Sequence, residues 1–222
     1  MSPFDKTWEE VYQQTSFGGG YPDTNLVRFV ARNLYSRNRK STKILEVGCG
    51  MGANLGYLVK EGFDVYGLDG SETAIKKCLE RLKNQDLSCH LVVEDACSLK
   101  FEKNFFDAIV DIECIYANTI GDIKTILQEA YRVLKNDGLF FSMMFSKNTW
   151  GYGLGKEIEK DTFTEINNRI FSGKGITHFF TVEEIQGLLS EVGFRDIEIN
   201  VTSRTENNQQ HTIEEFLCQA KK

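Results

Sequence analysis

Proline is scarce in this sequence: only Pro3 and Pro22 occur among 222 residues. Low-complexity stretches and internal repeats are absent as well, so nothing marks a linker, and the length suits one domain. No uninterrupted apolar run is long enough to cross a membrane, and the acidic N-terminus lacks the apolar core of a signal peptide. We therefore expect a single domain, residues 1–222, that is cytoplasmic and has no membrane partner.

Positive charge is also limited, because 26 Lys and Arg residues face 32 Asp and Glu residues, which gives a formal net charge of -6. Such a chain presents no basic field to a phosphate backbone, so we expect a small-molecule substrate and no nucleic acid. The six cysteines form no C-x-x-C pair and have no nearby His at zinc spacing. They predict free thiols in a reducing compartment and no metal site. Nothing in the sequence indicates the oligomeric state.

From Lys43 onward, short runs rich in β-branched residues alternate with segments of helical periodicity, which is typical of an α/β fold with a parallel sheet. Strands are expected at residues 43–47, 64–69, 89–95, 106–112 and 138–145. Helices are expected at residues 53–60, 72–83 and 123–134, with Ser71 capping the second and the turn KNDG following the third. Right-handed crossovers would place these helices on both faces of one Rossmann-like sheet.

The segments outside this core predict additional elements. An N-terminal helical arm, residues 1–40, is expected to contain helices at residues 8–14 and 23–34. After the core, residues 157–171 are compatible with a helix, residues 172–180 with a loop, and Thr181 caps a helix that ends at Val192. The last strands, FRDIEINV and HTIEEFLCQA, predict an antiparallel hairpin joined by a polar connector at residues 202–210.

The stretch KILEVGCGMGANL raises the question of which nucleotide it binds. Gly48, Gly50 and Ala53 satisfy the G-x-G-x-x-G/A dinucleotide fingerprint, which by itself predicts an NAD-dependent oxidoreductase. Glu46, however, precedes the first glycine, where its carboxylate would repel a pyrophosphate. S-adenosylmethionine carries a sulfonium and an ammonium and no phosphate, so Glu46 favours it over a dinucleotide.

Carboxylates recur at the other strand ends. Asp69 closes the second strand and is placed to bind ribose hydroxyls, which both cofactors possess. Asp95 follows the third strand, where it could accept a hydrogen bond from the adenine amino group. Asp111, near the end of the fourth strand, would add negative charge close to a methionine ammonium. Capping of a turn is the alternative role for Asp95 and Asp111. Four acidic strand ends favour a cationic ligand.

Five stretches resemble the successive motifs of class I S-adenosylmethionine-dependent methyltransferases: LEVGCGMGANL, VYGLDGS, VVEDACSL, FDAIVDIECI and RVLKNDGLFF. They occur in order between about residue 43 and residue 145. The resemblance implies S-adenosyl-L-methionine as cofactor, S-adenosyl-L-homocysteine as product, and a seven-stranded, mostly parallel sheet with a terminal reversed hairpin. It also implies a methionine end lined by Glu46, Gly48, Cys49, Gly50 and Gly52, a ribose and adenine site at Asp69, Gly70 and Ser71, and an adenine edge at Asp95 and Ala96.

The methyl acceptor is expected to bind residues 1–40 and 147–180, which lie outside the motifs. A hydroxyl acceptor needs a general base or an orienting hydrogen-bond partner. His178 is a candidate for the base, unless it is a loop histidine satisfied by backbone groups. Tyr116 is a second catalytic candidate. Further acceptor contacts are expected from Tyr12, Tyr21, Asn118 and Trp150.

The acceptor-side segments weakly resemble small-molecule methyltransferases of surface-polysaccharide pathways, which suggests a hydroxyl or amine of a polar, sugar-linked metabolite. Three alternatives remain open at this point. They are an NAD-dependent oxidoreductase, a non-catalytic S-adenosylmethionine-binding module, and an aminopropyl transferase, which would need an acidic proton-accepting cluster that is not evident after the fourth strand.

Overall fold

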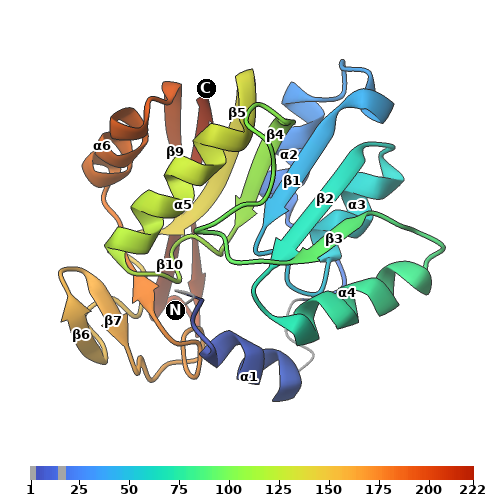
Figure 1. Cartoon of the computed structure of the whole chain (residues 1–222). Helices are drawn as coiled ribbons and strands as arrows, with labels where there is room; N and C mark the ends of the chain where they lie inside the picture. Colours follow the sequence, from blue (N-terminus) through green and yellow to red (C-terminus); the bar gives the residue numbers. More distant parts are fainter. Residues whose placement is uncertain (1–3, 15–18) are drawn as a thin grey trace.

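The computed structural model describes residues 4–14 and 19–222, and its central feature is a seven-stranded sheet (Figure 1). The strand order is β3-β2-β1-β4-β5-β10-β9. Strand β10 is antiparallel to both of its neighbours, whereas the other pairs are parallel. The strands are β1 Lys43–Val47, β2 Asp64–Asp69, β3 His90–Val93, β4 Phe106–Ile112, β5 Leu134–Phe145, β9 Arg195–Glu206 and β10 His211–Lys221. The predicted mostly parallel sheet with its reversed hairpin is confirmed.

Helices cover both faces of this sheet because successive strand residues point to opposite sides. One buried cluster joins the strands to α2 (Thr24–Asn33), α3 (Ala53–Lys60) and α4 (Glu72–Lys83). The other joins them to α5 (Ile120–Val133) and α6 (Val182–Val192). A short 3-10 helix, Arg39–Ser41, precedes β1. Among residues 4–14 and 19–222, no helix has the length and hydrophobicity that crossing a membrane requires.

The carboxyl ends of β1, β2, β4 and β5 meet at one edge of the sheet. Figure 1 shows α1 (Thr7–Gln14) and a small second sheet at this edge. The small sheet consists of β6 (Lys156–Glu159), β7 (Thr162–Thr164) and β8 (Thr177–His178). Ligands of open α/β sheets bind at the carboxyl ends of the strands. The region between the main sheet, α1 and the small sheet is therefore where a ligand site is expected.

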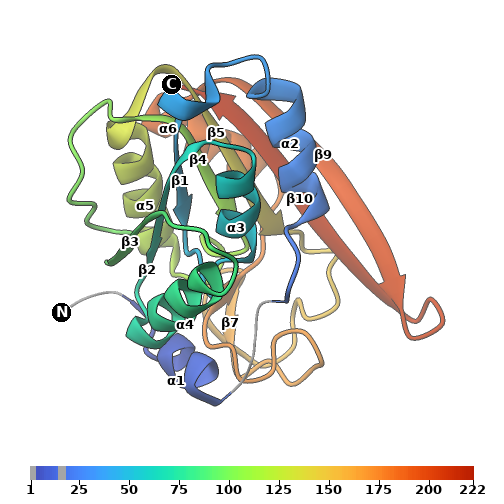
Figure 2. The ribbon, with the colours of Figure 1, turned by 90° about the vertical axis from the view of Figure 1, so that its right-hand side faces the viewer.

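Three sequence predictions need correction. Residues 157–171 form no helix: they include β6 and β7, because Asp161 adopts a left-handed backbone (φ 62) and turns the chain back. The predicted connector at 202–210 is shorter, since β9 runs to Glu206 and the turn uses three left-handed residues, 207–209. Figure 2 shows this hairpin extending beyond the helices. The KNDG turn belongs to β5, which contains a register shift opposite β4.

Candidate active site

The loop between β1 and α3 is shaped by glycines at positions that other residues would strain. Gly48 and Gly50 have φ angles of 67° and 50°, in the left-handed region that L side chains rarely adopt. A Cβ on Gly48 would overlap the Cys114 side chain, and one on Gly50 would press against the Tyr12 hydroxyl. The glycines therefore let the backbone of this loop approach neighbouring groups closely.

Glu46 is a buried carboxylate with one unsatisfied oxygen. The residue is 2% exposed, and its Oε1 accepts a hydrogen bond of 2.7 Å from Asn54 Nδ2. No described residue donates to its Oε2. Burial raises the pKa of Glu46 to about 8. Because a buried carboxylate oxygen without a donor is costly, this position suits a ligand that brings an N–H donor or a positive charge.

Asp69 ties the glycine loop to the start of α4. Its Oδ2 accepts from the Gly50 N–H and its Oδ1 from the Ser71 N–H, both at 2.9 Å. Burial raises the pKa of Asp69 to about 6, although both backbone hydrogen bonds oppose the shift. Each oxygen keeps a lone pair, so the carboxylate can still accept from a ligand.

Two adjoining cavities flank the glycine loop. The first, of about 70 Å³, lies beside Asp69, Asp95 and Ala96. The second, of about 420 Å³, lies beside Glu46 and the glycine loop and has the size of a ligand site. Four residues, namely Trp8, Tyr12, Gly48 and Glu113, line both cavities. No Lys or Arg is found among the described residues that line either one. The combined site therefore favours a cationic ligand over an anionic one.

Four residues of the N-terminal arm line the first cavity, namely Phe4, Asp5, Trp8 and Tyr12. The Phe4 N–H donates to Asp95 Oδ2 at 3.2 Å, and the Phe4 ring lies so close to Gly70 that a Cβ there would overlap it. Figure 2 shows α1 beside α4. Glu9 of α1 accepts hydrogen bonds from the Ser71 and Thr73 hydroxyls, which lower the pKa of Glu9 to about 2. The arm thus sits where a nucleoside would approach the sheet.

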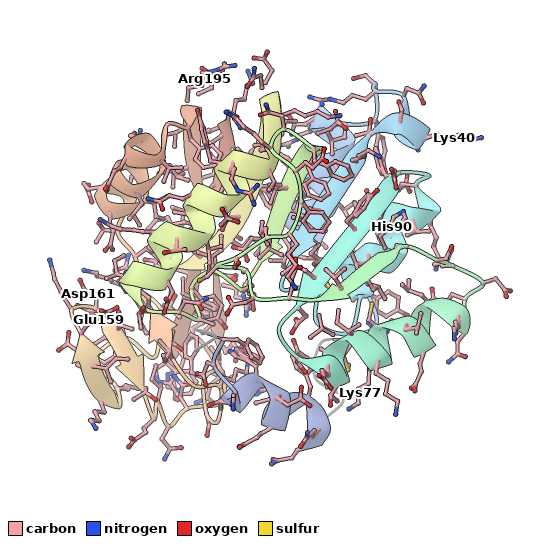
Figure 3. The ribbon with its side chains drawn as sticks, in the orientation of Figure 1. Lys40, Lys77, His90, Glu159, Asp161 and Arg195 are labelled. Carbon is pink, nitrogen blue, oxygen red and sulfur yellow. The ribbon has the colours of Figure 1, made fainter. Side chains whose placement is uncertain are left out.

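A further contact holds the other end of α1. Lys77, labelled on α4 in Figure 3, donates from Nζ to the Tyr12 carbonyl at 2.5 Å. Tyr12 itself is buried and lines both cavities, and burial is the main cause that raises its pKa. The phenol therefore stays protonated.

Most of the predicted site residues line these cavities. Glu46, Cys49, Gly50, Gly52, Tyr21 and Tyr116 line the second, Asp69, Asp95, Ala96 and Asn118 line the first, and Gly48 and Tyr12 line both. Gly70 and Ser71 line neither cavity. Gly70 lies against the Phe4 ring, and the Ser71 hydroxyl donates to Glu9. Ser71 is completely buried and caps α4 by accepting from the Ala74 N–H.

Asp111 requires a correction. Its Oδ1 accepts from the Cys114 and Ile115 N–H groups, and its Oδ2 accepts from the Ser142 hydroxyl at 2.5 Å. The residue is completely buried and lines neither cavity. Its carboxylate organises the turn after β4 instead of facing a ligand, which is the capping role left open above.

His178 and Trp150 also lie elsewhere than expected. His178 belongs to β8 and is 1% exposed. Its Nδ1 is 2.6 Å from Thr162 Oγ1, and its Nε2 is 3.3 Å from Glu184 Oε1. The Trp150 ring stacks on His211 with a centroid distance of 3.6 Å. Neither residue lines the two cavities, so the structure does not bring them to the glycine loop. Glu159 and Asp161, labelled in Figure 3, lie at the end of β6 and in the turn that leads to β7 of the small sheet.

Glu113 is the main site residue that the sequence reasoning missed. It follows β4 directly, lines both cavities and has a left-handed backbone (φ 62). A non-glycine residue in this conformation is strained, and such strain concentrates at functional sites. A carboxylate at the carboxyl end of a parallel strand indicates a site residue, and Glu113 has this position. Asp111, two residues earlier, is a carboxylate at the same strand end, so the sequence alone does not distinguish them.

Comparison with known proteins supports one family. Residues 44–138 match a family model described as a methyltransferase domain. The Drosophila melanogaster tRNA N(3)-methylcytidine methyltransferase Mettl2 is 28% identical over 174 residues, covering 74% of this chain and 52% of that protein. The chain thus spans about half the length of that relative. Because the relative's name refers to tRNA, the expected exclusion of nucleic acid is not confirmed.

Two solved structures are similar in fold. A SAM-dependent methyltransferase from Methanosarcina mazei superposes with a TM-score of 0.70 at 25% identity, covering 85% of this chain and 96% of that one. The phosphoethanolamine N-methyltransferase 2 of Haemonchus contortus, solved with S-adenosyl-L-methionine, has a TM-score of 0.68 at 20% identity, covering 98% of this chain and 57% of that one. The second likeness concerns the fold alone.

Proposed function

Because this chain belongs to the class I S-adenosylmethionine-dependent methyltransferases, we propose that it transfers a methyl group to an amine or hydroxyl of a polar small molecule. The observation that carries the proposal is the orphaned Oε2 of Glu46 beside the second cavity. S-adenosylmethionine has an ammonium that could satisfy this oxygen. A dinucleotide would instead bring a pyrophosphate toward a buried carboxylate, with no Lys or Arg among the described lining residues to balance it.

The residues present fit the cofactor in distinct roles. Glu46 would bind the ammonium, and the glycine loop would let the methionine end lie against the backbone. Asp69 would accept from ribose hydroxyls and Asp95 from adenine, with Ala96 beside the base. The bound cofactor supplies an already activated methyl group. The chain then has to align the acceptor and exclude water, a role that residues 4–14, with the buried Tyr12, would fill over the glycine loop.

The acceptor would lie in the second cavity. Tyr12, Tyr21 and Tyr116 are among its lining residues, and such amphipathic side chains suit a ligand with several polar groups. Asn118 lines the neighbouring cavity, where its amide donates to the Cys114 and Ile115 carbonyls and keeps its oxygen available. A sugar-linked metabolite of surface-polysaccharide biosynthesis would meet these requirements.

Thermal melting in the presence of different ligands tests the cofactor assignment. We expect S-adenosylhomocysteine to raise the melting temperature and NADH to leave it unchanged, since a ligand stabilises only the protein that binds it. Stabilisation by NADH alone would favour an oxidoreductase and contradict the proposal.

Incubation with S-adenosylmethionine and a library of small metabolites, read by mass spectrometry, tests the reaction. A product heavier by one methyl group is expected. Cofactor binding without any product would favour a non-catalytic binding module, and a product heavier by an aminopropyl group from decarboxylated S-adenosylmethionine would favour aminopropyl transfer.

A further inference from the structure

A third cavity adjoins the second one. Its volume is about 460 Å³, within the range of roughly 300–1,000 Å³ that is usual for small-molecule sites. Four residues line both the second and the third cavity, namely Tyr21, Pro22, Gly52 and Ala53. The Tyr21 side chain at this junction is 89% exposed, so its ring does not form a packed wall between the two spaces. One elongated ligand can therefore occupy both cavities.

Two helices bring cations to the third cavity. Gly52, Gly56 and Lys60 recur at intervals of four residues along α3, so they share one face of that helix, and all three line the cavity. Arg81, in the last turn of α4, lines the cavity as well. Basic residues in the last turn of a helix complement its dipole, which accounts for Lys60 and Arg81 without any ligand. Their hydrogen bonds and the other lining residues point beyond that role.

Hydrogen bonding within the protein leaves a donor of Arg81 unsatisfied. Its Nη2 donates to the Gly19 carbonyl at 2.6 Å, whereas its Nη1 is buried and no described residue accepts from it. Lys60 Nζ donates to Gln85 Oε1 at 2.6 Å, which uses one of its three N–H groups. Neither cation forms an ion pair with a described residue. Because a buried donor without an acceptor is costly, this position suits a ligand that brings an anionic oxygen.

Charge is segregated between the cavities. The first and second are lined by several Asp and Glu residues and by no described Lys or Arg. The third is lined by two cations and by no described Asp or Glu. Lys60 lies eight residues after Gly52, which is roughly 12 Å along the axis of α3. Lys60 therefore faces a group that lies away from the glycine loop.

We infer that the methyl acceptor carries an oxyanion, a phosphate or a carboxylate, and that Lys60 and Arg81 bind this group in the third cavity. The inference rests on the proposed methyl transfer, in which the second cavity holds the group that receives the methyl. Arg81 donates from Nη1 and Lys60 from its remaining N–H groups, and both hydrogen bonds are strengthened by charge. The acceptor is then an elongated molecule with the methylated group at one end and the negative charge at the other.

Binding of a simple oxyanion tests the subsite before the acceptor is known. The protein is saturated with S-adenosylhomocysteine, so that the glycine loop is occupied, and pyrophosphate binding is followed by phosphorus-31 NMR at constant ionic strength. We expect saturable binding that Arg81→Gln and Lys60→Gln each weaken by about tenfold, the scale of one lost hydrogen bond between charged groups.

The matched control for this measurement is Lys83→Gln. It removes an exposed lysine from the last turn of α4 that does not line the cavity, so the affinity for pyrophosphate should stay unchanged. Absence of saturable binding, or equal affinities in all three variants, would show no more than a general attraction of anions to the surface and would overturn the inference.

Methyl transfer distinguishes the two oxyanions. The metabolite library is assayed with S-adenosylmethionine before and after treatment with a phosphatase. Loss of the methylated product identifies a phosphorylated acceptor, and a product that persists but depends on Arg81 identifies a carboxylate. Arg81→Gln should raise KM by about tenfold and leave kcat nearly unchanged, because a remote anion is bound equally in the ground state and the transition state.

Two results of the transfer assay would contradict the inference: an uncharged acceptor, or a wild-type KM in both Arg81→Gln and Lys60→Gln. Failure of the wild-type protein to bind S-adenosylhomocysteine would instead overturn the proposed function. Pyrophosphate binding that depends on Arg81 would then remain as an anion site without a methyl acceptor, so the two failures are distinguishable.

Discussion

Glu46 is the residue on which the proposed cofactor site depends most. It combines complete burial, a single internal donor from Asn54, and an oxygen that lacks any described partner. We predict that Glu46→Gln weakens S-adenosylhomocysteine binding by about tenfold or more, because a hydrogen bond to a charged group contributes roughly 1.5–3 kcal/mol. Isothermal titration calorimetry measures the effect, with Glu102→Gln on an exposed loop as the matched control. Equal affinities in both variants would remove Glu46 from the site.

The raised pKa values of buried carboxyl groups predict how the stability of the protein depends on pH. Glu46 and Glu215 each have a folded-state pKa of about 8 against an ordinary value of 4.5. Between these values the folded chain holds more protons than the unfolded chain, so the free energy of unfolding falls as pH rises. Asp69 and Asp111, with pKa values raised by burial to about 6 and 7, act in the same direction.

Urea unfolding of the ligand-free protein checks this sign. We expect a lower free energy of unfolding at about pH 9 than at about pH 6, with a difference of a few kcal/mol. Glu46→Gln should reduce the difference, because the amide does not titrate. A protein that is equally stable, or more stable, at the higher pH would contradict the assignment of these carboxyls as protonated in the fold.

At the scale of elements, α1 and residues 4–6 cover the first cavity. The first cavity, about 70 Å³ with the arm in place, is far below the roughly 300 Å³ of small ligand sites. A nucleoside therefore needs the arm to shift before it can lie beside Asp69 and Asp95. The contacts of Glu9 with Ser71 and Thr73 resist this shift.

Weakening these contacts should change ligand kinetics. We predict that Glu9→Gln increases both the association and the dissociation rate of S-adenosylhomocysteine by about threefold or more, since a lid that opens more often admits and releases ligand faster. Stopped-flow fluorescence, with Trp8 as a reporter in the first cavity, measures both rates. Glu10→Gln, an exposed neighbour on the same helix, is the control. A change confined to the dissociation rate would indicate a ligand contact instead of a lid.

Helices and strands whose own residue pattern defines a buried face could be predicted from the sequence, whereas a segment shaped by distant tertiary contacts could not. Residues 43–112 were predicted closely because each strand and helix there has a buried face that its own residue pattern defines. The local composition of residues 157–171 is compatible with a helix, which the structure does not contain. In the structure, Phe163 packs against Phe179 at a centroid distance of 6.0 Å, and the left-handed Asp161 turns the chain. Such tertiary contacts override local propensity.

Single residues of the candidate site were also difficult to predict from the local sequence. Asp111 and Glu113 are both carboxylates at the end of β4, two residues apart, and side-chain alternation assigns them to the same side of an ideal strand. The left-handed backbone at Glu113 separates them, so Asp111 caps the turn while Glu113 reaches both cavities.

At the scale of the whole molecule, the sheet gathers negative charge at one edge. Asp69, Asp95 and Glu113 come from three strand ends and line the two cavities, in a chain whose formal net charge is -6. Glu46, which burial keeps protonated in the ligand-free protein, adds no charge to this field. S-adenosylmethionine and S-adenosylhomocysteine share their amino and carboxyl groups and differ by the methyl group and one positive charge. A field of this sign should therefore attract the first more strongly during diffusion.

Ionic strength separates this long-range attraction from the contacts made after binding. We predict that the association rate of S-adenosylmethionine falls by about tenfold between roughly 0.01 M and 1 M salt, where the Debye length shrinks from about 30 Å to about 3 Å. The rate for S-adenosylhomocysteine should fall much less, because it lacks the sulfonium charge. Stopped-flow measurement of both ligands in the same salt series provides its own control for effects of salt on the arm. Parallel salt dependences would show that the acidic edge acts on the ligand only after contact.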